Sequence, residues 1–267
     1  MRHILFLSVL FLFCLTANAK KDYVEIKTPS MVEFLKNWYG LEPNEKGYYS
    51  MDSLHRVYFY KVTELPLPPE FKYLRNLSNI VVFTSDNNNI LDFSPFEDIF
   101  IGYLEIKSLV KVKVIMGKQD RLKHLVLYSN CVGLDIKKCT NIERLVCFKN
   151  NKLEDLDLSN NLYLKYIDCD NNKLTSLDLR NNLYLEVLIC SHNQLEYLDL
   201  SQNDRLKELD CSYNKFRSLE DLLLPKSITH FYFSPCGNFR ERPQKFYIDS
   251  FPNLEILQLE EIQIKVK

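Results

Sequence analysis

Four cysteines recur at a nearly constant interval and offer the widest range of chemistry in this chain. Cys147, Cys169, Cys190 and Cys211 are separated by 22, 21 and 21 residues. Thiolates can hold a metal, form disulfides or take part in redox reactions. A metal site needs cysteines that converge from short loops, typically about two to four residues apart. These four occur once per repeating segment, which is a poor arrangement for a metal.

The same interval bears on disulfide formation. Equivalent strands of neighbouring turns lie about 4.8 Å apart, which is inside the Cα range of a disulfide. In-register parallel strands point their Cβ atoms the same way, so the Cβ separation stays near ~4.8 Å, above the disulfide mean of about 3.8 Å. We therefore predict a column of buried, reduced thiols. The sequence leaves open a disulfide among Cys131, Cys139 and Cys236, which lie outside the column.

Acidic residues are the other candidates for chemistry. Asp168 and Asp170 are two residues apart, and Asp210 follows two turns later. Two turns separate Asp168 and Asp210 by about 10 Å, too far to share an ion, so solvated carboxylates are the simpler interpretation. No H-x-x-x-H pattern and no G-x-S-x-G context occurs. The sequence thus predicts no catalytic residue, no metal and no cofactor.

The cysteines belong to a repeat that must position them. Each unit has the form L-x-x-L-x-C-x-x-N, as in LKELDCSYN from Leu206, and it alternates with segments such as LEDLDLSNN from Leu153. Side chains on a strand alternate faces, so both segments turn an apolar side inward, and stacked turns bury it. Degenerate copies are expected at Leu54-Val57-Phe59, Leu77-Ile80-Val82, Phe96-Ile99-Ile101, Ile228-Phe231-Phe233 and Leu254-Leu257-Leu259.

Polar residues recur where the strands end. An amide side chain carries a donor and an acceptor and can satisfy backbone groups that leave the strands at a corner. We predict two columns of buried asparagines bonded to loop backbone: Asn130, Asn150, Asn172, Asn193 and Asn214, and then Asn161, Asn182 and Asn203. We also predict a structural role, through backbone hydrogen bonds at the turns, for a column of aspartates: Asp135, Asp157, Asp178 and Asp199.

The consensus L-x-x-L-x-[LC]-x-x-N-x-L resembles that of leucine-rich repeats, and the alternation of LDLSNN with LxCxxN resembles exported bacterial members of that family. The clearest match runs from Leu122 to Phe216. The resemblance implies an α/β repeat solenoid: a curved, right-handed leucine-rich-repeat solenoid dominated by parallel β-strands, with a partner-binding role. The repeats before Leu122 and after Phe216 depart from the family pattern.

Three segments organise the chain. Residues 1–19 combine Arg2 and His3 with an apolar run and an Ala17-Asn18-Ala19 site, which predicts a cleaved signal peptide and export to the periplasm, cell surface or medium. An uncleaved anchor and a lipid anchor at Cys14 are the weaker alternatives. Residues 20–52 form the N-terminal cap, and residues 53–267 form the solenoid, with regular repeats at 122–216. No later segment is apolar enough to span a membrane.

The N-terminal cap contains one predicted helix. Thr28 is its N-cap, Pro29 its first residue and Gly40 its stop. Its apolar residues are Val32, Phe34, Leu35 and Trp38. A helix there would shield the end of the core.

Charge and glycine content limit the classes of partner. The chain has 34 basic and 35 acidic residues and a formal net charge of −1, so it lacks the electrostatic footprint of a nucleic-acid-binding protein. Glycine is scarce, with 6 residues, which argues against loops that bring bare backbone to phosphate.

The outward residues of the first segments form the predicted binding site on the concave sheet. The early turns bring together aromatic and aliphatic side chains, a composition typical of binding patches. The predicted partner-binding residues are Val126, Tyr128, Val146, Phe148, Tyr166, Asp168, Asp170, Ile189, Glu208, Asp210 and Tyr232.

The predicted function is that of an exported, non-enzymatic module, expected to be a monomer, which binds a protein or, as second choice, a glycan. A rigid sheet displays side chains at fixed spacing, so recognition orders little of the protein. Two alternatives stay open: a right-handed β-helix polysaccharide lyase or hydrolase that uses Asp168, Asp170 and Asp210 as acids, and a purely structural envelope or adhesin component.

Overall fold

The computed structural model describes residues 23–54, 57, 59–62, 65–74, 77, 79–82, 89–96, 101–108, 110–128, 130–150, 152–234, 236 and 251–259. The predicted signal peptide (residues 1–19), Ile99 and residues 260–267 lie outside this set. Among the described helices, none combines the length and the apolar character needed to cross a bilayer.

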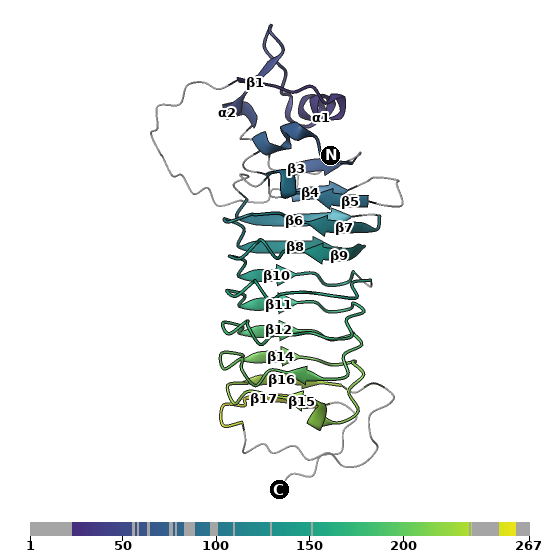
Figure 1. Ribbon diagram of the computed structural model, residues 1–267, viewed down its shortest axis with the longest axis vertical. Coiled ribbons are helices and arrows are strands. Elements are labelled where there is room, and N and C mark those ends of the chain that lie inside the picture. Colours follow the sequence, from purple (N-terminus) through teal and green to yellow (C-terminus); the bar gives the residue numbers. More distant parts are fainter. Residues whose placement is uncertain are drawn as a thin grey trace, which may run out of the picture.

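Ten strands form one parallel sheet along the long axis of the molecule (Figure 1). In sheet order they are β3 (Phe59–Val62), β4 (Asn79–Val82), β6 (Tyr103–Ser108), β8 (His124–Tyr128), β10 (Arg144–Val146), β11 (Tyr166–Asp168), β12 (Val187–Ile189), β14 (Glu208–Asp210), β16 (His230–Phe233) and β17 (Ile256–Leu259). Each strand pairs with the next turn, and Leu125, Leu145 and Ile167 stand in register. The parallel solenoid that the repeat predicts is confirmed.

The second arm of each turn faces the back of this sheet. Early turns form a three-stranded parallel sheet, β5 (Asn89–Asp92), β7 (Val112–Ile115) and β9 (Cys131–Asp135), and later ones a two-stranded pair, β13 (Leu198–Asp199) and β15 (Leu222–Leu223). In the described part of the chain, three short 3-10 helices complete the turns: η1 (Pro69–Tyr73), η2 (Ser94–Phe96) and η3 (Leu219–Asp221). One continuous core of inward leucines, isoleucines and cysteines lies between the arms.

The N-terminal end carries the expected helix. Helix α1 (Pro29–Tyr39) begins after Thr28 and ends at Gly40 in the left-handed conformation, and it buries Phe34 and Leu35. Trp38 is an exception, since 60% of its surface is exposed. Beside α1 lie α2 (Met51–Leu54) and the antiparallel pair β1 (Tyr23–Glu25) and β2 (Tyr48–Ser50).

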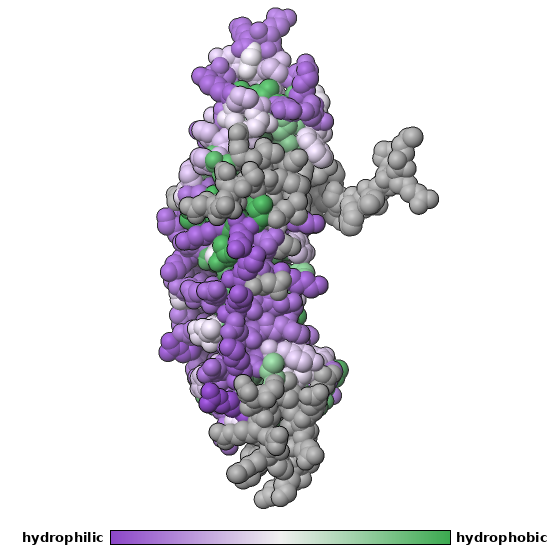
Figure 2. All heavy atoms as spheres, turned by 90° about the vertical axis from the view of Figure 1, so that its right-hand side faces the viewer, coloured by the Kyte–Doolittle hydropathy of each residue, from purple (hydrophilic) through white to green (hydrophobic). Residues whose placement is uncertain are grey.

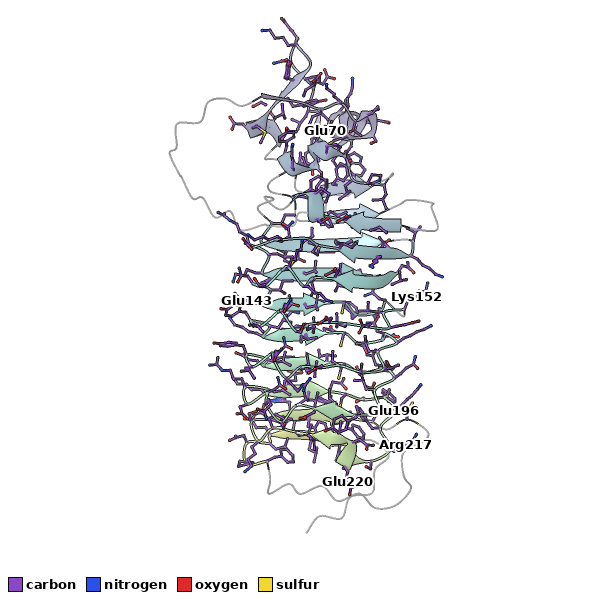
Figure 3. The ribbon with its side chains drawn as sticks, in the orientation of Figure 1. Glu70, Glu143, Lys152, Glu196, Arg217 and Glu220 are labelled. Atoms are coloured by element: carbon purple, nitrogen blue, oxygen red, sulfur yellow. The ribbon has the colours of Figure 1, made fainter. Side chains whose placement is uncertain are left out.

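A buried glutamate joins this cap to the first turns. Glu70, labelled in Figure 3, accepts hydrogen bonds from the Lys27 backbone N–H at 2.8 Å and from the Thr28 hydroxyl at 2.9 Å. Burial raises the pKa of the carboxyl, but these hydrogen bonds to its ionised form outweigh burial and hold the pKa below its usual value. Glu70 therefore stays ionised although it is buried between the cap and the first turns.

Asparagine side chains donate to backbone carbonyls at both corners, as predicted, and the structure shows in addition that these hydrogen bonds join successive turns. Asn193 donates from Nδ2 to the carbonyls of Cys169 and Cys190 at 2.9 and 3.2 Å, while its Oδ1 accepts the Leu174 N–H at 3.0 Å. Asn182, on the other corner, donates to the carbonyls of Leu158 and Asn161, both in the preceding turn. Seven of the eight predicted asparagines are buried: Asn150, Asn161, Asn172, Asn182, Asn193, Asn203 and Asn214. Asn130 is only partly buried.

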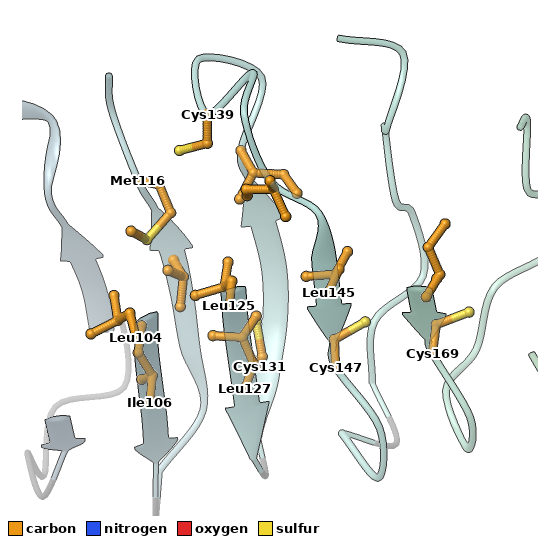
Figure 4. Close-up of a cluster of buried hydrophobic side chains, with 14 of the residues drawn as sticks. Leu104, Ile106, Met116, Leu125, Leu127, Cys131, Cys139, Leu145, Cys147 and Cys169 are labelled. Carbon is orange, nitrogen blue, oxygen red and sulfur yellow. The ribbon is translucent and has the colours of Figure 1, made fainter. Parts of the chain in front are cut away.

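The cysteine column is buried in the core. Cys147, Cys169, Cys190 and Cys211 have no exposed surface and are unbridged. Figure 4 shows Cys147 and Cys169 pointing the same way from successive strands, as expected of in-register parallel neighbours. Burial raises the pKa of each thiol well above its usual value. The column therefore packs as small apolar side chains with very little thiolate.

The three remaining cysteines of the described chain are also unbridged. Cys131 and Cys139 are buried, and their thiols donate to the Gly133 and Gly117 carbonyls. Burial raises the pKa of Cys131 to about 11 and of Cys139 to about 12. Cys236 is exposed.

Two upstream strands differ from the sequence prediction. The spacing Leu54-Val57-Phe59 was expected to form the first, but Leu54 ends α2, and Tyr60 rather than Val57 pairs with Ile80 of the next turn.

The second is the strand that follows η2. The spacing Phe96-Ile99-Ile101 was expected to form a strand, but Phe96 lies in η2 and β6 begins later. Within β6, Leu104 and Ile106 point inward and are buried, so the true motif is Ile101-x-x-Leu104-x-Ile106. The apolar spacing occurs in two overlapping frames, and only pairing with β8 selects between them.

Removal of one corner amide should destabilise the solenoid. Asn182→Ala loses two hydrogen bonds at 3.3 and 2.9 Å, so we expect the free energy of unfolding to fall by about 2 kcal/mol. Urea denaturation followed by circular dichroism measures this change. The neighbouring Asn181→Ala is the control, because Asn181 is exposed; an equal loss in both variants would contradict a corner-specific role.

Thiol labelling should separate the cysteines. In the folded chain from residue 20, iodoacetamide is expected to modify Cys236 and to spare the six buried cysteines, because alkylation needs an accessible thiolate. Peptide mass spectrometry before and after denaturation measures this pattern. Rapid labelling of Cys190 in the folded chain would contradict the buried column.

Candidate binding surface on the parallel sheet

The outward side chains of the large sheet form one surface, here called the sheet face, with three columns. The first column is Tyr103, His124, Arg144, Tyr166, Val187, Glu208 and His230. The central column is Glu105, Val126, Val146, Asp168, Ile189, Asp210 and Tyr232. The third is Lys107, Tyr128, Phe148, Asp170, Ser191, Ser212 and Ser234. Every predicted site residue therefore belongs to this one face.

Aromatic side chains of the early turns contact one another in pairs. The rings of Tyr128 and Phe148 meet edge to face at 5.3 Å. The Arg144 guanidinium lies 3.5 Å from the centre of the Tyr166 ring, which is a close cation–π contact. These contacts hold the side chains in place on the sheet.

Tyr103 is a member of the face that is missing from the predicted binding residues. Tyr103 is 41% exposed and its ring lies 6.3 Å from that of His124, while its hydroxyl donates to Glu105 at 3.1 Å. Burial and the Glu105 carboxylate raise the pKa of Tyr103 to about 12. Tyr103 could not be assigned to the face because its strand was expected at an earlier position.

Val126 and Val146 correct a second expectation. The sequence predicts both as exposed members of the patch, but they are only 6% and 5% exposed. Both stand in the central column, flanked by the larger side chains of the outer columns, such as Tyr128 and Phe148. Outward direction on a strand does not ensure exposure when bulky neighbours stand about 5 Å away. The aromatic side chains, not the valines, therefore form the accessible part.

The later turns make this face acidic and polar. The Asp170 carboxylate accepts from the Ser191 hydroxyl at 2.8 Å and lies 3.2 Å from His192 Nδ1. Asp168 and Asp210 each accept a backbone N–H two residues ahead, at 3.2 and 3.0 Å. Burial raises the pKa of Asp168, with smaller contributions from Asp170 and Asp210. Within the described residues, no three His, Cys, Asp or Glu side chains are placed to hold a metal ion.

A column of alternating charges borders the sheet face where the strands begin; we call it the charged margin. It consists of Lys123, Glu143, Lys165, Glu186 and Lys207, one from each turn. Glu143, labelled in Figure 3, contacts both Lys123 and Lys165 at 2.8 Å. Hydrogen bonds from these two lysines lower the pKa of Glu143 to about 2. Alternation thus places opposite charges, which attract, on successive turns.

The second-arm aspartates carry like charges on successive turns and are stabilised by backbone hydrogen bonds instead of by alternation. Asp157, Asp178 and Asp199 each accept the backbone N–H two residues ahead, at 3.0, 3.1 and 2.9 Å, and Asp135 does so at 3.2 Å. These bonds are the predicted structural role. Side-chain donors at Ser159, Arg180 and Ser201, together with these backbone N–H groups, lower the pKa of Asp157, Asp178 and Asp199.

Parallel turns, inward leucines and asparagine-bridged corners together specify the architecture. The chain has the leucine-rich repeat fold. No family model and no curated protein matches its sequence. Among solved structures, it is similar to the functional domain of InlJ from Listeria monocytogenes, which includes a cysteine ladder: identity is 20%, 80% of this chain and 55% of that domain are covered, and the TM-score is 0.45.

Two further solved structures share the likeness. Internalin C2 from Listeria monocytogenes is 16% identical over 77% of this chain and 92% of its own, with a TM-score of 0.49. A leucine-rich repeat protein of Leptospira interrogans is 16% identical over 81% of this chain and 69% of its own, with a TM-score of 0.45. The present chain spans about half of the InlJ domain.

Glu143 in the charged margin should make a small, pH-dependent contribution to the free energy of unfolding. The folded-state pKa of Glu143 is about 2, below the ordinary value of about 4.3, so its contribution is present above pH ~4.3 and is lost as the pH falls toward ~2. Glu143→Gln should therefore lower the free energy of unfolding at pH 7 by less than about 1 kcal/mol. Urea denaturation at pH 7 and pH 3 measures whether the difference shrinks; a constant difference would contradict this cause.

Proposed function

We propose that this protein is an exported, non-enzymatic binding module and that its sheet face holds a protein partner. The supporting observation is the pair of preformed contacts on adjacent strands, Tyr128 with Phe148 and Arg144 with Tyr166. Tyrosine and arginine are among the residues that dominate binding energy at protein interfaces. Because these side chains are held by their neighbours, binding orders few rotamers.

The acidic half of the face supports a partner with basic groups. Asp168, Asp170 and Asp210 are partly exposed and lie on the same side as the aromatic half. Complementary charge steers association and selects the orientation of the partner. The proposed partner therefore presents apolar side chains opposite the early turns and lysine or arginine opposite the later ones.

The geometry of the acids favours binding over polysaccharide cleavage. Asp168 and Asp210 accept hydrogen bonds from their own strands, and Asp170 is engaged by Ser191. A general acid and base pair instead needs carboxyl groups that converge on one substrate bond. Export is proposed on the sequence of residues 1–19.

Capture with a matched surface variant tests the proposal. The chain from residue 20 is immobilised and exposed to extracts of the producing cells and of a host, and bound proteins are identified by mass spectrometry. We expect a protein that the wild type captures and the triple variant Tyr128→Ala, Phe148→Ala, Tyr166→Ala loses, with a Kd at least about 30-fold higher by calorimetry.

The control is Tyr197→Ala, which removes a tyrosine that is 52% exposed in the second arm. It should bind as the wild type does, and circular dichroism should show all variants folded. Equal capture by the triple variant would overturn the sheet face as the binding site. Turnover of acidic or neutral polysaccharides would overturn the non-enzymatic function.

A further inference from the structure

A second surface, separate from the sheet face, exposes large apolar side chains. Leu162, Tyr163, Leu183 and Tyr184 are 47%, 50%, 52% and 39% exposed and occupy the same position in two successive turns, just before β11 and β12. The Tyr163 and Tyr184 rings lie 5.9 Å apart, and the Arg205 guanidinium lies 4.6 Å from the centre of the Tyr184 ring. We call these five residues the apolar ridge.

Packing of the core does not explain why the apolar ridge has large apolar side chains. Leu164 and Leu185, the next residues along the chain, are fully buried and supply the packing of these turns. The opposite margin of the solenoid is mostly hydrophilic over its middle turns (Figure 2). Apolar side chains exposed together on consecutive turns mark an interaction site.

The charged margin runs beside the apolar ridge. Tyr163 is followed two residues later by Lys165, and Tyr184 is followed two residues later by Glu186. The column therefore has the order Lys123, Glu143, Lys165, Glu186, Lys207, and Thr229 continues it in the next turn. The centre of the apolar ridge coincides with the step between Lys165 and Glu186.

This order is complementary to itself under one symmetry operation. A twofold axis that lies in the contact and is perpendicular to the stacking direction sets each column against its own copy with the order of turns reversed. When the axis passes between the turns of Tyr163 and Tyr184, Lys165 faces Glu186 of the second copy and Glu143 faces its Lys207. The same axis sets Leu162 against Leu183 and Tyr163 against Tyr184.

Two neighbouring positions of the twofold axis give less favourable contacts, one because like charges meet and the other because the apolar side chains meet polar ones. An axis through the turn of Lys165 sets Lys165 against its own copy and Glu143 against Glu186, which are like charges. An axis one step toward Glu143 restores opposite charges but sets Leu162 and Tyr163 against Thr140 and Asn141. One register satisfies both columns, and complementarity of this kind selects a single mode of association.

We infer that the apolar ridge and charged margin form a homodimer interface, in place of the monomer expected from the sequence, and that a second copy of this chain docks there with its turns in reverse order. An open hollow of about 800 Å³, lined by residues that include Glu186, Arg205 and Lys207, lies at the same margin and receives the Glu143 turn of the second copy. The dimer leaves the central and third columns of the sheet face available, so the inference does not rest on the proposed function.

Sedimentation of the chain from residue 20 tests the inference. The wild type is expected to dimerise at ~100 μM or below. Leu162→Asp with Leu183→Asp should raise the dimerisation Kd at least tenfold, since both copies lose the apolar contact. Tyr197→Asp, on an equally exposed tyrosine outside the ridge, should leave the Kd unchanged.

Charge reversal tests the register independently of folding. Glu186→Lys alone sets lysine against Lys165 of the second copy, and Lys165→Glu alone sets glutamate against Glu186, so each single variant should be monomeric. An equimolar mixture of the two single variants should form a heterodimer, because every facing pair is then opposite in charge. The double variant Lys165→Glu, Glu186→Lys should dimerise by itself.

Three outcomes would overturn the inference. A wild type that stays monomeric at ~100 μM excludes a dimer of useful affinity. A dimer that Leu162→Asp with Leu183→Asp leaves intact uses another surface. Single charge variants that are folded by circular dichroism and monomeric, but do not associate when mixed, exclude the register.

Discussion

The solenoid depends on the hydrogen bonds that buried asparagines donate to carbonyl groups at its corners. Within the strands, backbone N–H and C=O groups hydrogen-bond to neighbouring turns. The chain leaves the strands twice per turn, and the buried backbone groups at these corners need other partners. Asn193 and Asn214 each contact carbonyls of their own turn and of the preceding one. A side chain that bonds two turns at once sets their separation and register together.

This fixed register frees the outward positions to vary. Inward positions are apolar throughout because the core is continuous, while the outward positions change from aromatic residues in early turns to aspartate and serine in later ones. A surface graded in this way presents apolar contact and negative charge on one rigid support. The side chains of this surface keep their relative positions because asparagine hydrogen bonds at the corners fix the sheet that carries them.

Stacking also brings charged side chains at equivalent positions of successive turns close together, and the structure stabilises them in two ways. On the margin, Lys123, Glu143 and Lys165 alternate and neutralise one another. In the second arm, Asp157 and Asp178 carry the same charge on adjacent turns and accept backbone N–H groups instead. The first solution produces a pattern that a second copy can match, whereas the second is satisfied within each turn.

The repeat, the inward columns of the regular turns and the asparagine corners follow from the amino-acid sequence alone, because alternation along a strand and a constant period encode side-chain direction locally. Three features emerge only when the turns stack: the frame of β6 around Leu104, the burial of Val126 and Val146, and the contact of Arg144 with Tyr166. Each of these depends on what stands beside a residue in the next turn, about 20 residues away in the chain. Direction is a local property, whereas exposure and pairing depend on the size and charge of neighbours that only the stacked turns bring together.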